Sequence, residues 1–90
     1  MQVALELGQR PRVGETVILR DGRKGEVAAV RKASQVLSLL REDEAMVFGL
    51  SCKSTYGKNW QSYYYQADVI VRGQIVTAEP YTIESVVRAS

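Results

Sequence analysis

Hydrophobic and polar residues alternate along much of the chain, and this period of two is typical of half-buried β-strands. The clearest case is the stretch of residues 13–30, VGETVILRDGRKGEVAAV. Val17 and Leu19 fall on one face of its first half, and the Asp21-Gly22 pair tolerates the positive φ that a tight turn needs. The alternation resumes after the turn. This stretch therefore predicts an antiparallel hairpin with one strand on each side of the turn.

Later segments continue the same alternation. In residues 45–53 the side chains of Met46, Phe48, Leu50 and Cys52 share one face, which predicts a strand that buries them. Cys52 is the one cysteine of the chain, and its place on that face predicts a buried thiol. Further short strands are predicted at residues 3–7, 75–77 and 81–88.

Residues 33–44, ASQVLSLLREDE, admit two interpretations. A short helix around residues 34–43 is favoured because Ser34 can cap it and because Val36 and Leu40 fall on one helical face. The acidic residues at its end argue for the alternative, since carboxylates at a helix C-terminus oppose the helix dipole. The alternative is a strand followed by a charged turn. We favour the helix.

Together these elements predict a mainly β fold, a small barrel of five to seven antiparallel strands with one short helix around residues 34–43. Ninety residues are enough for one small core and too few for two. We expect residues 1–12 to form an N-terminal arm or an edge strand. Residues 13–90 are then a single small barrel domain.

The glycines and valines of the predicted hairpin are spaced as in the opening hairpin of SH3-like small barrels, and their order resembles the KOW motif of ribosomal and transcription-elongation proteins. The resemblance covers about a fifth of the chain. It is carried by Gly14, Val17, Gly22, Gly25 and Val27. It implies that the loop contacts RNA or a partner protein.

Positive charge is concentrated around this hairpin. Residues 9–32 hold seven basic and three acidic side chains, a net of +4, whereas the whole chain is only +2. Arg20, Arg23 and Lys24 are therefore predicted as a basic binding surface for phosphates or for a partner. In the alternative interpretation, the basic side chains decorate the solvent face of the hairpin and protect an edge from aggregation.

A cluster of aromatic residues marks a second candidate surface in residues 60–71, WQSYYYQADVIV. In an unbroken strand, Tyr65 and the valines that follow it share the buried face. Trp60 and Tyr64 would then point outward, where aromatic side chains serve recognition. The alternative is that a bulge turns Trp60 inward, or that both rings form a lid on the barrel.

The amino-acid composition limits the kinds of catalytic and metal site that the chain can form. Histidine is absent, which removes the commonest general base and metal ligand, and the acidic residues are scattered or lie in one solvated run. We therefore predict no catalytic residues, no cofactor and no metal. No apolar run approaches the roughly 20 residues of a membrane span, and the N-terminus lacks a secretory leader, so we expect a cytoplasmic protein.

The function predicted from the sequence is a non-enzymatic binding module. Its surface is expected to combine Trp60 and Tyr64 with the basic hairpin, and its partner to be a protein, a second copy of the chain or a nucleic acid, with no membrane contact. The alternative is a small-ligand or minimal enzymatic site formed between subunits of a homo-oligomer. A nucleic-acid partner requires the aromatic and basic groups to lie on one continuous surface.

Overall fold

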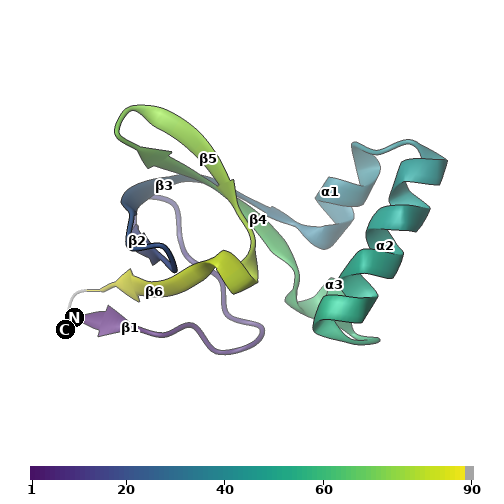
Figure 1. Ribbon diagram of the computed structural model, residues 1–90, viewed down its shortest axis with the longest axis horizontal. Coiled ribbons are helices and arrows are strands. Elements are labelled where there is room, and N and C mark those ends of the chain that lie inside the picture. Colours follow the sequence, from purple (N-terminus) through teal and green to yellow (C-terminus); the bar gives the residue numbers. More distant parts are fainter. Residues whose placement is uncertain (89–90) are drawn as a thin grey trace.

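A computed structural model describes residues 1–88 of the chain, so the last two residues of the predicted barrel domain lie outside it. Six strands form one antiparallel sheet in the order β1-β6-β2-β3-β4-β5 (Figure 1). The strands are β1 (Gln2–Val3), β2 (Thr16–Leu19), β3 (Lys24–Lys32), β4 (Tyr65–Val71), β5 (Gln74–Ala78) and β6 (Ile83–Val87). The end strands β1 and β5 do not pair with each other, so the sheet of the described residues is open rather than closed.

Helices interrupt the sheet between β3 and β4, and a 3₁₀ turn precedes β6. They are α1 (Ala33–Ser38), α2 (Glu42–Tyr56), α3 (Trp60–Tyr63) and the 3₁₀ turn η1 (Pro80–Thr82). The three α-helices lie together at one end of the longest axis of the molecule (Figure 1). The mainly β prediction is confirmed, and the helical share is larger than predicted. No helix in the described part of the chain is both long and apolar enough to cross a bilayer.

The predicted hairpin is formed by β2 and β3. Val17 pairs with Gly25 across the two strands, and Gly22 occupies the turn with a φ of 93°. The Gly22 backbone N–H donates to the Leu19 carbonyl at 2.9 Å, and the Arg23 N–H donates to Asp21 Oδ1 at 3.1 Å. Glycine suits this turn because it adopts positive φ without a steric penalty.

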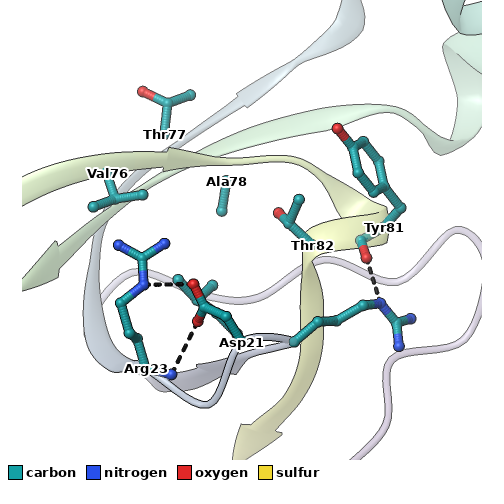
Figure 2. Close-up of a pocket in the computed structure, with 9 residues that line it drawn as sticks. Asp21, Arg23, Val76, Thr77, Ala78, Tyr81 and Thr82 are labelled. Atoms are coloured by element: carbon teal, nitrogen blue, oxygen red, sulfur yellow. Dashed lines mark hydrogen bonds and ion pairs between the residues drawn. The ribbon is translucent and has the colours of Figure 1, made fainter.

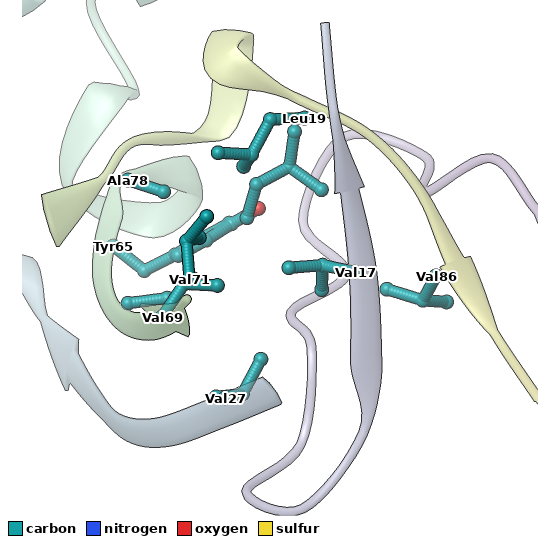
Figure 3. Packing of buried hydrophobic residues seen from close by; sticks show 10 residues of the cluster. Val17, Leu19, Val27, Tyr65, Val69, Val71, Ala78 and Val86 are labelled. Atoms are coloured by element: carbon teal, nitrogen blue, oxygen red, sulfur yellow. The ribbon is translucent and has the colours of Figure 1, made fainter. Parts of the chain in front are cut away.

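The sheet encloses the main hydrophobic core between its curved strands (Figure 3). Alternate residues of β4 point into it, as the alternation predicted, and they meet residues of β2, β3, β5 and β6. The buried members are Val17, Leu19, Val27, Tyr65, Ala67, Val69, Val71, Ala78, Ile83 and Val86. Burial of these side chains is the main source of stability for the sheet.

The predicted strand at residues 45–53 is wrong, because these residues lie in the middle of α2. Inward positions recur every three or four residues along this helix, at Ala45, Phe48, Gly49, Cys52 and Tyr56. Of these, Cys52 is buried as predicted, although on a helix rather than a strand.

The acidic run that argued against a helix begins α2 instead of ending α1. Arg41 is the N-cap, and its backbone N–H donates to Glu44 Oε1 at 3.0 Å. Carboxylates in a first turn complement the helix dipole. The helix favoured around residues 34–43 is confirmed only as the shorter α1, which ends at Ser38.

The exposure predicted for Trp60 and Tyr64 is wrong, because their side chains are only 7% and 2% exposed. The chain does not run as one strand here, because residues 60–63 form the short helix α3, which directs both rings against α1 and α2. Phe48 packs edge-on against both, with ring centroids 5.9 Å from Trp60 and 5.1 Å from Tyr64. These rings are the core of the three packed helices α1, α2 and α3, which we call the helical layer.

A partly buried ion pair joins β3 to β4. The Arg31 guanidinium donates two hydrogen bonds to the Asp68 carboxylate, at 2.9 and 2.7 Å, and the two side chains are 25% and 22% exposed. The hydrogen bond from Arg31 holds the pKa of Asp68 below its ordinary value. Because the pKa of Asp68 is lower in the folded chain than in the unfolded chain, the pair stabilises the fold fully at pH values above the pKa that Asp68 has when unfolded.

This stabilisation should be lost as the pH falls through the folded pKa of Asp68. We expect the melting temperature to decline from about pH 5 to about pH 2, and Asp68→Asn to flatten this decline and to cost about 1 to 2 kcal/mol at neutral pH. Thermal melts followed by circular dichroism across this range test it. The exposed Asp21–Arg23 pair is the control, because its side chains are 54% and 50% exposed and water screens them. An Asp21→Asn effect as large as that of Asp68→Asn would contradict the prediction.

Candidate functional site

The predicted site residues lie in two separate places. Arg20 and Arg23 flank the β2–β3 turn and line one pocket with β5 and η1, and Lys24 is exposed at the start of β3. Trp60 and Tyr64 are buried among the helices and are not part of the surface. The basic and aromatic groups therefore do not form one continuous surface, as a nucleic-acid partner would require.

The pocket beside the hairpin has a volume of about 310 Å³ and separates the β2–β3 turn from β5 and η1 (Figure 2). Its arginines are already engaged within the chain. Arg23 Nε donates to Asp21 Oδ2 at 2.7 Å, and Arg20 Nε donates to the Tyr81 carbonyl. The backbone N–H of Arg23 lowers the pKa of Asp21. The local charge is thus partly neutralised.

A larger hollow lies between α2 and the sheet, and we call it the helix–sheet cleft. Its volume is about 640 Å³, within the range of roughly 300–1,000 Å³ that is usual for ligand pockets. One wall comes from α2, and the other from β4, β5 and the start of η1. The lining residues are Phe48, Ser51, Cys52, Thr55, Tyr56, Gln66, Thr77, Glu79 and Tyr81.

Glu79 is the centre of a hydrogen-bond network at this cleft. Its Oε2 accepts a hydrogen bond from the Tyr64 hydroxyl at 2.6 Å, and its Oε1 has a long contact of 3.4 Å with the Tyr81 hydroxyl. Gln66 Nε2 donates to the Tyr64 oxygen at 3.1 Å, so the side-chain amide of Gln66 also belongs to the network. Burial raises the pKa of Tyr64, so its hydroxyl stays protonated as a donor.

Two further groups of the cleft are neutral. The hydroxyl oxygen of Tyr56 is buried without a hydrogen-bond partner in the described part of the chain, and burial raises its pKa. Cys52 is 4% exposed, and burial raises its thiol pKa to about 11, so the thiolate is scarce at neutral pH. Neither group is therefore prepared as a nucleophile.

The face of α2 that points away from the sheet carries a second candidate surface. Leu39 at the end of α1 and three residues of α2, Met46, Val47 and Leu50, are 65–75% exposed, and we call these four residues the outer stripe. Beside them is an apolar hollow of about 510 Å³, lined by Leu40, Asp43, Glu44, Val47 and Phe48. Large apolar side chains that gather on a surface commonly mark an interaction site.

Sequence reasoning missed both the cleft and the outer stripe. The stripe had a signal, because the apolar residues 46, 47 and 50 have the spacing of one helical face, but the strand interpretation of this segment concealed it. Glu79 had no such signal, since only the fold brings it beside residues of α2. Among residues 1–88, no three His, Cys, Asp or Glu side chains gather closely enough to hold a metal ion.

Comparisons with known protein families, with characterised proteins and with solved structures find no match for this chain. Any function must therefore be inferred from the geometry of these surfaces.

Proposed function

We propose that this chain is a non-enzymatic binding module whose partner is a protein, and that the outer stripe is the contact surface. The observation that carries the proposal is the exposure of Met46, Val47 and Leu50, which form a continuous apolar face on a helix whose opposite face is already packed. Burying each such side chain contributes about 1.5 to 3 kcal/mol. A partner that covers this surface is therefore bound with a favourable free energy.

The occupant we propose is a second copy of the chain, because the charges of α2 are complementary to themselves. The first turn is acidic, with Glu42, Asp43 and Glu44, whereas Lys53 lies in the last turn. Two α2 helices packed antiparallel about a two-fold axis place the first turn of each opposite the last turn of the other. Each acidic turn then meets a lysine, and the helix dipoles oppose each other favourably.

The shape of the surface also fits this arrangement. The hollow beside Val47 lies in the first half of α2, and Leu50 projects from the second half. Antiparallel pairing brings the Leu50 of each copy towards the hollow of the other. A two-fold contact in which a projecting leucine meets an apolar hollow resembles the ridge-and-groove packing of helix pairs.

For the fold, we propose a partly open SH3-like barrel. The strand order β6-β2-β3-β4-β5 supports this proposal. Strands β2 to β5 form a curled meander, and β6 follows the 3₁₀ turn η1 and pairs with β2, the first strand of the hairpin. The helical layer is then an insertion between the second and third strands of that meander. Phosphate binding by the hairpin is the weaker proposal, because Arg20 and Arg23 already have partners within the chain.

The mass in solution tests the proposed assembly. We expect light scattering to give twice the chain mass of 10.0 kDa at low and at high salt, with or without a short mixed oligonucleotide. Leu50→Glu should weaken association about a hundredfold or more, because a carboxylate enters an apolar contact twice per dimer. Ile75→Glu, at an equally exposed residue of β5, is the matched control and should leave the mass unchanged. A monomer that binds the oligonucleotide only at low salt would overturn the proposal and favour the hairpin.

A charge-reversal experiment tests the antiparallel orientation. Asp43→Lys alone and Lys53→Asp alone each place like charges opposite one another across the two-fold axis, so each should weaken self-association. A mixture of the D43K and K53D chains should associate, because both contacts again join opposite charges. Failure of the mixture to associate better than either variant alone would reject the antiparallel pairing.

A further inference from the structure

The helix–sheet cleft has an unbalanced negative charge. Glu79 is the only charged residue among the nine that line it, and no lysine, arginine or amino terminus of the described residues lies within 4 Å of its carboxylate. The other partly buried carboxylates have such a partner: Asp68 has Arg31, and Glu15 has Arg88. A carboxylate without a counter-ion in a partly enclosed cleft favours the approach of a cation.

The hydrogen bonds of Glu79 leave one oxygen available. Oε2 is occupied by the short bond from Tyr64, whereas the 3.4 Å contact of Oε1 with Tyr81 exceeds the usual range of about 2.5 to 3.0 Å for an O–H···O bond. Oε1 can therefore accept a stronger bond from a ligand. Gln66, Ser51 and Thr77 line the same cleft and add side-chain oxygens as further acceptors.

The rest of the cleft is apolar and aromatic. Phe48 belongs to one wall, and Tyr56 and Tyr81, whose ring centroids are 6.4 Å apart, line the same hollow. Tyr81 is 53% exposed, so its ring is open to a ligand. Aromatic faces attract cations, and they also cover an alkyl or aryl stem.

We propose that the helix–sheet cleft binds a primary ammonium group carried on a short apolar stem, with the ammonium on Glu79 Oε1 and the stem between Phe48 and the tyrosines. An ammonium group has three donors and no acceptor, which matches a site that offers acceptors around a single negative charge. A carboxylate or phosphate ligand would meet repulsion from Glu79. Two sources share this chemistry: a free organic amine, and the lysine side chain of a protein.

This site can be tested separately from the proposed self-association. The residues of α2 that line the cleft, such as Ser51 and Thr55, lie on a different side of the helix from Met46 and Leu50. Phe48 lines both the cleft and the hollow beside Val47, whereas Glu79 belongs to the cleft and Leu50 to the outer stripe. Variants at Glu79 and at Leu50 therefore test the two properties separately.

Titration with benzylamine, followed by two-dimensional NMR of the ¹⁵N-labelled chain, tests the proposal, and benzyl alcohol is the neutral probe of nearly the same shape. We expect benzylamine to shift the Gln66 side-chain amide and to bind about tenfold or more tightly than benzyl alcohol. Nα-acetyl-lysine amide is the third probe. Tighter binding of benzylamine assigns a free amine as the ligand, and tighter binding of the lysine derivative assigns a protein side chain.

Two variants locate the ammonium. Glu79→Gln keeps an acceptor for Tyr64 but removes the charge, so it should reduce the preference for benzylamine over benzyl alcohol to about onefold. Thr55→Lys places an ammonium within the cleft in the last turn of α2, where a cation suits the helix dipole, and it should compete with benzylamine. Ser54→Lys adds the same charge one residue away, outside the cleft, and should bind benzylamine as the parent chain does.

Protection of Cys52 from a thiol reagent supplies a second measurement, because this residue lines the same cleft and, being 4% exposed, is labelled slowly in the folded chain. Bound benzylamine should slow the labelling of the parent chain and not that of T55K. Equal affinity for the amine and the alcohol, or an unchanged preference in both E79Q and T55K, would overturn the proposal. Both results are independent of the mass of the assembly.

Discussion

Replacing Trp60 with alanine should lower the free energy of unfolding by about 3 to 5 kcal/mol. The side chain is 7% exposed and packs against Phe48 and Tyr64 at the centre of the helical layer, so its loss leaves a large cavity between α1, α2 and α3. A domain of this length has a stability of roughly 5 to 13 kcal/mol, so the variant should be close to unfolding. Urea titration followed by far-ultraviolet circular dichroism measures the change.

The control for this prediction is Ile75→Ala, since Ile75 is 67% exposed on β5. Its substitution should cost about 0.5 kcal/mol or less, as is usual for surface positions. The prediction would be contradicted if Trp60→Ala were as stable as this control and instead lost partner binding. The Trp60 side chain would then belong to an exposed surface, as the alternation in the sequence predicted, and not to the core between the helices.

A second large loss of stability is expected from Gly25→Ala. A methyl group at this position of β3 would lie 2.5 Å from the Ile70 carbonyl oxygen and would overlap the side chains of Val69 and Val71. The carbonyl belongs to the paired backbone of β4 and cannot move without breaking the sheet, so the substitution should cost about 3 kcal/mol or more and reduce the yield of folded protein. Thermal melting and the soluble yield measure the effect.

Gly14→Ala separates crowding from backbone conformation. Gly14 has a φ of 91°, and a methyl group added to it would have no atom within 4 Å, so only the conformational penalty of about 1 to 2 kcal/mol applies. At Gly25 the penalty is steric, because its φ is not in the left-handed region. Equal losses at the two glycines would show that the close approach of β3 and β4 is absent.

Helix α2 connects the two proposals of function. Its inner face packs Cys52 and Phe48 against Trp60 and Tyr64 and also lines the cleft, whereas its outer face is apolar and exposed. A helix with apolar residues on opposite faces is unusual for a surface position unless the second face is also covered. One helix can therefore contribute to both a partner contact and a ligand site, which Leu50→Glu and Glu79→Gln test respectively.

The sequence alone predicted the features that depend on neighbours along the chain. The β2–β3 hairpin follows from Asp21-Gly22 and the flanking alternation, and the buried face of β4 follows from Tyr65, Val69 and their partners. These predictions hold because a strand must alternate between core and solvent, and because few residues tolerate the turn conformation. The burial of Cys52 was also predicted, although its secondary structure was not.

Only the tertiary structure decided the segment from Glu42 to Tyr64. Its apolar residues satisfy a period of two at Met46 and Phe48 and a helical period at Phe48 and Cys52, so the pattern does not distinguish strand from helix. The choice depends on what covers the inward face, which is Trp60, brought there by α3. Glu79 is joined to the cleft in the same way, through contacts between segments distant in the chain. Local sequence patterns contain no information about such contacts, because they arise only when the helical layer packs on the sheet.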